Sequence, residues 1–245
     1  MRAARLIARL DIKGKNLIKS INLEGLRVLG DPNKFALKYY EDGADEIIFM
    51  DTVASLYGRN QLEKIISNAT KNVFIPTTVG GGIRGLDDAL FILKSGADKV
   101  ALNSAAVKNP KLISEIANHI GSQSTVISIE AKKRKDKLWE VYIINGRERT
   151  KINVLDWIQE VEKLGAGEIL LTSIDQEGTR KGFDLELAKA ASKITNLPII
   201  ISGGFGKLTH IDDLKDMCTI EAIAIADSLH YNRFNINTLK NKLLK

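Results

Sequence analysis

Cysteine is nearly absent from this sequence, which contains only Cys218. A single cysteine excludes a disulfide within the chain and is typical of a reducing compartment, so we expect a cytoplasmic protein. Long hydrophobic runs are also missing, since no stretch approaches the roughly 18 apolar residues of a membrane span. The basic start, MRAARLIARL, lacks the apolar segment and cleavage site of a signal peptide and is interpreted as a first strand.

Histidine is almost as scarce as cysteine. The three histidines (His119, His210 and His230) fall in predicted helices or after the last predicted strand. They do not form a cluster with metal-ligand spacing, so we expect structural or surface roles and no metal or cofactor.

Negative charge is the smaller share, and the net charge of +6 suits anionic ligands. The densest basic cluster, KKRKDK (132–137), has no aromatic residues interleaved with it. We therefore interpret it as a solvated hairpin tip rather than a nucleic-acid site, and we expect neither nucleic acid nor membrane as a partner.

Three segments of the first half return in altered form in the second half. ARLDIK (8–13) corresponds to ISIEAK (127–132), DGADEIIFMDT (42–52) to LGAGEILLTSI (164–174), and IPTTVGGG (75–82) to LPIIISGGFG (197–206). Similar segments repeating at one offset indicate a duplicated unit. We predict half-barrel repeats over about residues 1–122 and 123–245, within a single domain of residues 1–245.

Short apolar runs alternate with amphipathic segments along the whole chain. The predicted strands are 5–11, 46–51, 73–79, 98–103, 125–130, 168–173, 198–202 and 221–226, with predicted helices at 31–43, 60–70, 86–96 and 110–121. Eight such units in two similar halves favour an α/β fold, a single (β/α)₈ TIM barrel, over a doubly wound open sheet. Two insertions interrupt the pattern: residues 14–30 are expected to be a long loop, and 139–146 a small hairpin.

Chemistry in such barrels lies at the carboxyl ends of the strands. Asp11 and Glu130 therefore face each other across the barrel mouth, from the first and fifth strands. Such a pair can divide the roles of general acid and general base. The alternative is that each carboxylate caps a loop or neutralises a nearby lysine.

Glycine-rich turns follow strands three and seven at the same rim: TVGGGI (78–83) and ISGGFGK (201–207). Glycine lets the backbone approach a ligand closely, and N–H groups at a helix start attract phosphate. The loops after strands seven and eight are a frequent phosphate site in this fold. Duplication predicts a second site after strands three and four, and hence a ligand phosphorylated at both ends.

Four segments of the sequence carry a family resemblance: LDIK (10–13), TVGGGI (78–83), GADKVALNSAAVKNP (96–110) and WIQEVEKLGAGEILLTSID (157–175). They resemble the cyclase subunit of imidazole glycerol phosphate synthase, a histidine-biosynthesis enzyme. The resemblance implies that ammonia from a glutaminase partner, in a heterodimer, cuts and cyclises a doubly phosphorylated ribulosyl intermediate. The products would be imidazole glycerol phosphate and an aminoimidazole carboxamide ribotide. By resemblance Asp11 and Glu130 are catalytic, and the substrate or phosphate contacts are Lys19, in a mobile first loop, and Gly82, Asn103, Ser104, Gly178, Gly203, Gly204 and Ala226.

Four charged residues each begin a predicted strand and so gather at the opposite end of the barrel: Arg5, Glu46, Lys99 and Glu168. Two positive and two negative side chains there can close a ring of salt bridges, which by itself suggests a stabilising role. The resemblance implies instead an ammonia gate, with Asp98 and Gln123 near the glutaminase docking surface.

Four residues depart from the family pattern at the other end. Glu130 and Glu177 replace aspartates, Asp227 stands where the family has serine, and Arg9 replaces a small residue. A carboxylate at the second phosphate site is repulsive unless its side chain turns away. Because strand side chains alternate, Arg9 shares the inward face with Asp11, and we expect it to pair with Glu130 or Asp51.

These departures leave three functions open. The first is the cyclase-lyase of histidine synthesis. The second is a paralogue that uses glutaminase-derived ammonia for acetamidino modification of a sugar in surface polysaccharide biosynthesis. The third is a non-catalytic ammonia channel that only activates its glutaminase.

Overall fold

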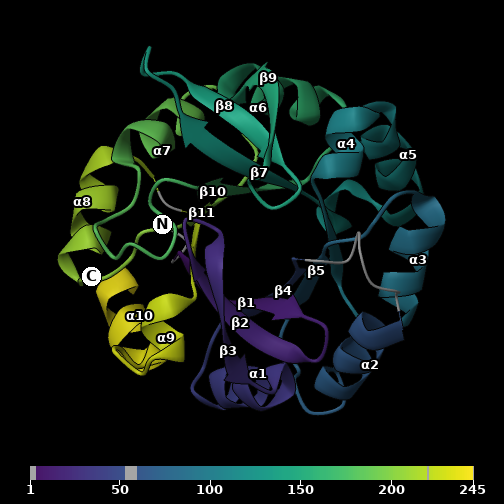
Figure 1. Cartoon of the computed structure of the whole chain (residues 1–245), viewed down its shortest axis with the longest axis vertical. Coiled ribbons are helices and arrows are strands. Elements are labelled where there is room, and N and C mark those ends of the chain that lie inside the picture. The colour runs from purple at the N-terminus through teal and green to yellow at the C-terminus, as the bar shows by residue number, and fades with distance from the viewer. Residues whose placement is uncertain (1–3, 53–59, 220, 245) are drawn as a thin grey trace.

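Eight parallel strands of the computed structural model close into a barrel, which Figure 1 shows encircled by helices. The structure describes residues 4–52, 60–219 and 221–244. The barrel strands are β1 (Arg5–Lys13), β4 (Glu46–Asp51), β5 (Thr77–Gly80), β6 (Lys99–Leu102), β7 (Thr125–Lys133), β10 (Glu168–Ser173), β11 (Ile199–Ser202) and β12 (Ala222–Ile225). Parallel pairing of β1 with β12 and of β7 with β10 closes the ring, which confirms the TIM barrel over the open sheet.

The helices follow the strands in the order that the alternating pattern predicts. They are α1 (Pro32–Glu41), α2 (Asn60–Ala69), α3 (Leu86–Lys94), α4 (Ser104–Lys108), α5 (Lys111–Ile120), the short η1 (Ser122–Ser124), α6 (Val154–Lys163), α7 (Leu185–Ser192), α8 (Thr209–Met217), α9 (Asp227–His230) and α10 (Ile236–Leu244). Side chains cap several of the helix starts: Asp31 accepts from the amide of Asn33, Asn153 from that of Leu155, and Asp184 from that of Leu187. Such caps satisfy backbone donors that a helix start leaves unpaired.

Both insertions form antiparallel strands that extend the barrel wall. β2 (Asn16–Ile21) and β3 (Glu24–Gly30) continue from β1, whereas β8 (Trp139–Ile143) and β9 (Glu148–Asn153) continue from β7. The expectation of a loop over residues 14–30 was therefore wrong, because β2 folds back onto β1 and pairs with it. The predicted hairpin is present, and it extends to Asn153.

Two apolar cores hold the barrel in shape. The larger one lies between the strands and the helices. The smaller one fills the barrel interior, with Ile7, Ile48, Leu170 and Ile200 all fully buried. A packed interior fixes the strand ends, and it therefore holds the side chains at both barrel openings in place.

Among the helices that the structure describes, none is long and apolar enough to cross a membrane. The descent of the two half-barrels from one duplicated unit stays a prediction, although each half carries an antiparallel extension on its first strand.

Candidate active site

Asp11 and Glu130 lie toward the carboxyl ends of β1 and β7, which stand on opposite sides of the eight-stranded ring. Both side chains are buried, with exposed fractions of 2% and 5%. The structure therefore places both carboxylates at the same end of the barrel and withdraws both from bulk water.

Arg9 points into the barrel, on the face that strand alternation predicts. Its Nε donates to Oδ1 of Asp11 at 2.9 Å, and its Nη1 donates to the hydroxyls of Thr172 at 2.8 Å and Ser202 at 3.2 Å. The expected partners were Glu130 or Asp51, but the carboxylate that Arg9 contacts is Asp11. The reason is geometric, because residues two apart on one strand face the same way and lie within reach of one side chain.

The Arg9–Asp11 pair fixes the charge of both groups. Burial alone would raise the pKa of the Asp11 carboxyl, but the charges of Arg9 and Lys19 outweigh it and hold that pKa below its usual value. Burial alone would lower the pKa of Arg9, but Asp11 and Glu177 raise it. Asp11 is therefore ionised at neutral pH.

Glu130 has the opposite protonation behaviour. Burial raises the pKa of its carboxyl to about 7, against smaller opposing effects of the Gly146 amide, Arg9 and Asn103. The Gly146 N–H donates to Oε2 of Glu130 at 2.7 Å and fixes the orientation of the carboxyl group. Two carboxyl groups with separated pKa values are the arrangement that divides acid and base roles.

A cavity of about 430 Å³ opens beside Glu130. Arg9 lines it together with the predicted phosphate-site residues Gly82, Asn103 and Ser104. Oδ1 of Asn103 is buried without a hydrogen-bond partner among the described residues, which leaves one acceptor at the cavity wall unsatisfied. The Ser104 hydroxyl already accepts a hydrogen bond from the Ile144 amide at 3.0 Å.

Lys19 lies on β2 and is buried, not in a mobile loop as the resemblance implied. Its ammonium group pairs with the buried carboxylate of Glu177. Burial would lower the pKa of Lys19, but Glu177 and Asp11 raise it, so the lysine stays charged. The Asn22 N–H also donates to the Glu177 carbonyl at 2.8 Å. The β2–β3 hairpin is thereby tied to the loop after β10.

The glycines of the second predicted phosphate site hold closely packed backbone. Gly203 and Gly204 have φ of 98° and 97°, a region that favours glycine. A Cβ on Gly204 would stand 1.9 Å from the Gly182 carbonyl oxygen.

Gly178 lines a separate cavity of about 440 Å³, and Ala226 lies directly before α9. Asp227, in the first turn of α9, lies within 4 Å of Arg180 and Arg233, which offset its charge.

The charged residues at the opposite opening form a closed ring. Arg5 contacts Glu46 at 2.8 Å and also pairs with Glu168, whereas Lys99 contacts Glu168 at 2.8 Å and Glu46 at 3.1 Å. The Thr78 hydroxyl donates to Oε1 of Glu46 at 2.6 Å. Each carboxylate therefore has two cationic partners, as the sequence pattern predicts.

Asp98 and Gln123 are both exposed, just before β6 and in η1. Asp98 accepts from the Thr77 amide at 2.7 Å, which gives it a structural contact at the start of β5. Phe74 precedes β5 and has an exposed fraction of 74%, the largest among the exposed apolar side chains described. Sequence reasoning did not single it out, because an exposed aromatic inside an apolar run has the same pattern as a buried one.

The histidines occupy structural positions. Nδ1 of His230 lies 2.7 Å from the Tyr39 hydroxyl in the core, and burial lowers the pKa of His230 to about 3. Nδ1 of His210 accepts from the Gly206 amide at 3.2 Å, and His119 contacts the Glu115 carbonyl of its own helix. Within the described ranges, no three of the histidine, cysteine, aspartate and glutamate side chains form a group able to hold a metal ion.

Thr172 and Ser202 were not predicted as site residues, although both contact Arg9. The available signal was a hydroxyl at an inward position near the end of an otherwise apolar strand, in EILLTS and IIIS. Arg180 and Arg233 were missed because no spacing in the sequence brings them together.

Comparison of the sequence with known proteins identifies the family of this chain. The family model described as "Histidine biosynthesis protein" matches residues 5–235. Imidazole glycerol phosphate synthase subunit HisF of Legionella pneumophila is 64% identical over 208 residues, covering 85% of this chain and 98% of that protein. The subunits of the same name from Bacillus cereus (strain G9842) and Clostridium beijerinckii (strain ATCC 51743 / NCIMB 8052) are 44% and 47% identical, each across 99% of this chain and 96% of their own length. The chain therefore belongs to the histidine biosynthesis protein family, among the HisF subunits of imidazole glycerol phosphate synthase.

Proposed function

We propose that this chain is the ammonia-dependent cyclase of imidazole glycerol phosphate synthase, with Glu130 as proton donor and Asp11 as proton acceptor. The observation that carries the proposal is the separation of their pKa values at one barrel opening. Ammonia addition to a carbonyl needs a donor for the oxygen and an acceptor for the nitrogen proton. A carboxyl with a pKa of about 7 serves the first role near neutral pH, and an ionised one serves the second.

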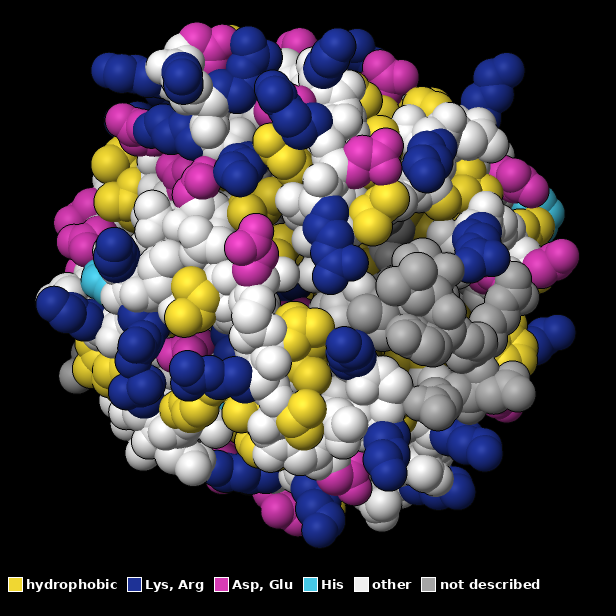
Figure 2. All heavy atoms as spheres, viewed as in Figure 1, with side chains coloured by type: hydrophobic (Ala, Val, Ile, Leu, Met, Phe, Trp, Pro, Cys, Tyr) yellow, Lys and Arg dark blue, Asp and Glu magenta, His cyan; other side chains and the backbone are white. Residues whose placement is uncertain are grey.

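The substrate lies across the opening, with one phosphate at each side. Gly82, Asn103 and Ser104 bind the first phosphate in the cavity that Glu130 also lines. Gly178, Gly203, Gly204 and Ala226 bind the second, near the other cavity. Lys19 orients substrate from the β2–β3 hairpin. Lys and Arg side chains surround this face in Figure 2, and such a face attracts a doubly phosphorylated substrate.

The ring of Arg5, Glu46, Lys99 and Glu168 acts as the entry gate for ammonia. A glutaminase subunit docks over that end, against Asp98, Gln123 and the exposed Phe74, to form a heterodimer in the cytoplasm. Support comes from the position of the ring at the opening opposite the carboxylates and from the exposure of these three side chains. No resident cofactor enters the proposed reaction.

Arg9 favours a second candidate function. A guanidinium beside the catalytic carboxylate alters the site, and a different acceptor, such as the sugar of an acetamidino modification, would accommodate it. The third candidate, a non-catalytic channel that activates a glutaminase, needs only the ring and the docking face.

Turnover with free ammonia separates these functions. The purified protein is mixed with the doubly phosphorylated ribulosyl intermediate and an ammonium salt at about pH 8, which bypasses the glutaminase. We expect consumption of the intermediate with equal release of both products. Absence of turnover, together with stimulation of a glutaminase, would exclude the cyclase and leave the other two functions.

A further inference from the structure

The second cavity is lined by an excess of positive side chains. Its volume is about 440 Å³, and it lies between the β2–β3 hairpin, the loop of Gly178 and α9. The charged residues of its lining are Lys19, Arg27, Arg180 and Arg233 on the positive side, and Glu24 and Asp227 on the negative side. Glu177 already offsets Lys19, so three arginines stand against two carboxylates, a balance that favours an anionic ligand even with Asp227 in place.

Asp227 lies between two of these arginines. Its Oδ1 stands 3.7 Å from Nε of Arg180 and 3.6 Å from Nε of Arg233, and has no hydrogen-bond partner among the described residues. These distances are longer than hydrogen bonds, so the carboxylate attracts both guanidinium groups without binding their N–H donors. Those donors stay available to a ligand.

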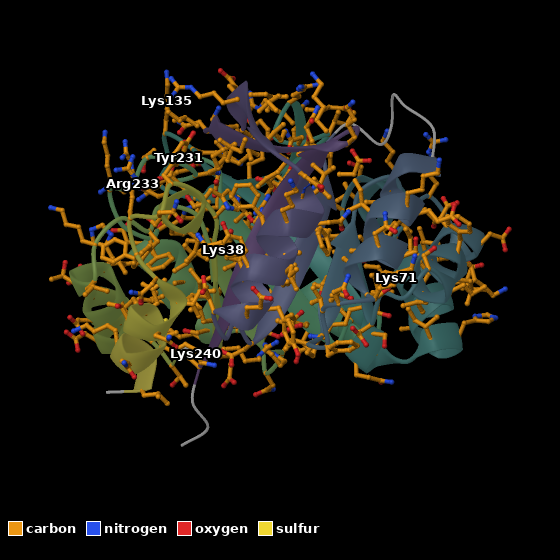
Figure 3. All side chains as sticks on the ribbon, turned by 90° about the horizontal axis from the view of Figure 1, so that it is seen from below. Lys38, Lys71, Lys135, Tyr231, Arg233 and Lys240 are labelled. Carbon is orange, nitrogen blue, oxygen red and sulfur yellow. The ribbon has the colours of Figure 1, made fainter. Side chains whose placement is uncertain are left out.

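Arg180 and Arg233 differ from Lys19 in their exposure and in the pairing of their charge. Lys19 is buried and already paired with Glu177. Arg180 and Arg233 each have an exposed fraction of 43%. Arg233 also lies over the Tyr231 ring, 5.6 Å from its centroid, and Figure 3 shows both residues at the hairpin end of the barrel, with Lys240 toward the other end. Ring and carboxylate together limit where the Arg233 guanidinium can lie.

We propose that Asp227 is a positioning residue that holds Arg180 and Arg233 as a two-guanidinium clamp for a phosphate monoester. Guanidinium groups bind phosphate through paired N–H donors, and two of them match a dianion. The inference deepens the proposed function, because the clamp would hold one end of the same substrate. It differs from the expectation of repulsion: a carboxylate that organises two cations would strengthen the site for an anion.

The direction in which Asp227→Asn changes the affinity for phosphate tests this assignment. If Asp227 positions the arginines, Asp227→Asn weakens phosphate binding although it removes a negative charge. If Asp227 only repels phosphate, the same substitution strengthens binding. Asparagine is nearly the same size as aspartate, so a change in packing does not decide the result.

The experiment is a titration of the full chain with inorganic phosphate, followed by ¹⁵N NMR at two glycine amides. Gly178 lines this cavity and Gly82 lines the other one, so each reports its own site. We expect Asp227→Asn to raise the Kd at Gly178 about fivefold, and Arg180→Ala or Arg233→Ala about tenfold each. The Kd at Gly82 should change less than about twofold in all three variants.

A matched control is Asp212→Asn, which removes another ion-paired aspartate, 2.6 Å from Lys242 on the outer helices. It should leave both Kd values unchanged. A lower Kd at Gly178 in Asp227→Asn, or no change in the two arginine variants, would overturn the clamp.

Ribose 5-phosphate is the second probe. Binding at least as tight as that of inorganic phosphate supports a sugar phosphate as the ligand, and weaker binding overturns the substrate assignment. Neither titration needs turnover, so failure of the cyclase reaction with an intact clamp would count against the proposed function only.

Discussion

Replacing Glu130 with glutamine is expected to lower kcat with free ammonia by about a hundredfold or more at neutral pH. Glutamine keeps the size of the side chain, but it cannot donate an acidic proton. Loss of a general acid costs about this factor. The measurement is steady-state consumption of the ribulosyl intermediate, with each variant corrected for its folded fraction.

The pH dependence of kcat/KM is a second test of Glu130 as the proton donor. Because the pKa of Glu130 is raised to about 7, its donor form is present below that pH and is lost above it. With free ammonia held constant, kcat/KM of the native protein should fall above about pH 7, whereas Glu130→Gln should show no such fall. A native profile that rises through pH 7 would assign Glu130 as the base instead.

Glu140→Gln is the matched control for this substitution. Glu140 is also buried, lies on the neighbouring strand β8, and is paired with Arg149 at 2.9 Å. Its pKa is lowered, chiefly by Arg149, so it holds no proton at neutral pH. We expect kcat within about twofold of the native value, and an equal loss in both variants would show that the effect is not specific to Glu130.

Asp11→Asn should lower kcat to a similar extent, by about a hundredfold or more, for a different reason. The substitution removes the ionised carboxylate that we propose as the proton acceptor, and it leaves the buried Arg9 without its anionic partner. Breaking a buried pair in this way costs about 3 kcal/mol or more of unfolding free energy. Activity is measured well below the midpoint of thermal unfolding, and stability is measured separately by urea denaturation.

Asp45→Asn separates the two effects. Asp45 pairs with Lys240 at 2.6 Å and accepts from the Leu6 amide at 2.8 Å, at the other end of the barrel. This variant should lose some stability and keep its kcat. Native-like turnover by folded Asp11→Asn would remove Asp11 from the reaction and leave it as the structural partner of Arg9.

Strand ends and inward faces were predictable from the sequence, because they depend on local patterns. The apolar runs predicted all eight barrel strands, but the strand predicted at 73–79 begins only at Thr77. The strand starts brought Arg5, Glu46, Lys99 and Glu168 together. Alternation also placed Arg9 inside the barrel. These features follow from the period of a strand and the ring order, which the sequence carries directly.

Side-chain partners were less predictable, because they depend on distances between segments. Arg9 forms its salt bridge with Asp11 on its own strand rather than with Glu130 on the opposite strand. The 14–30 segment lacked a clear alternating pattern, and its pairing with β1 was missed. The neighbours of Asp227, Arg180 and Arg233, come from other parts of the chain and were not predicted.

The division of roles between the two carboxyl groups is tested most directly by their own titration. ¹³C NMR of carboxyl-labelled protein, with signals assigned from Glu130→Gln and Asp11→Asn, gives both midpoints without substrate or partner. We predict that Glu130 titrates at about pH 7 and that Asp11 titrates below the ordinary aspartate value of about 3.9. A Glu130 midpoint near the ordinary glutamate value of about 4.3, or an Asp11 midpoint above that of Glu130, would contradict the assignment of donor and acceptor.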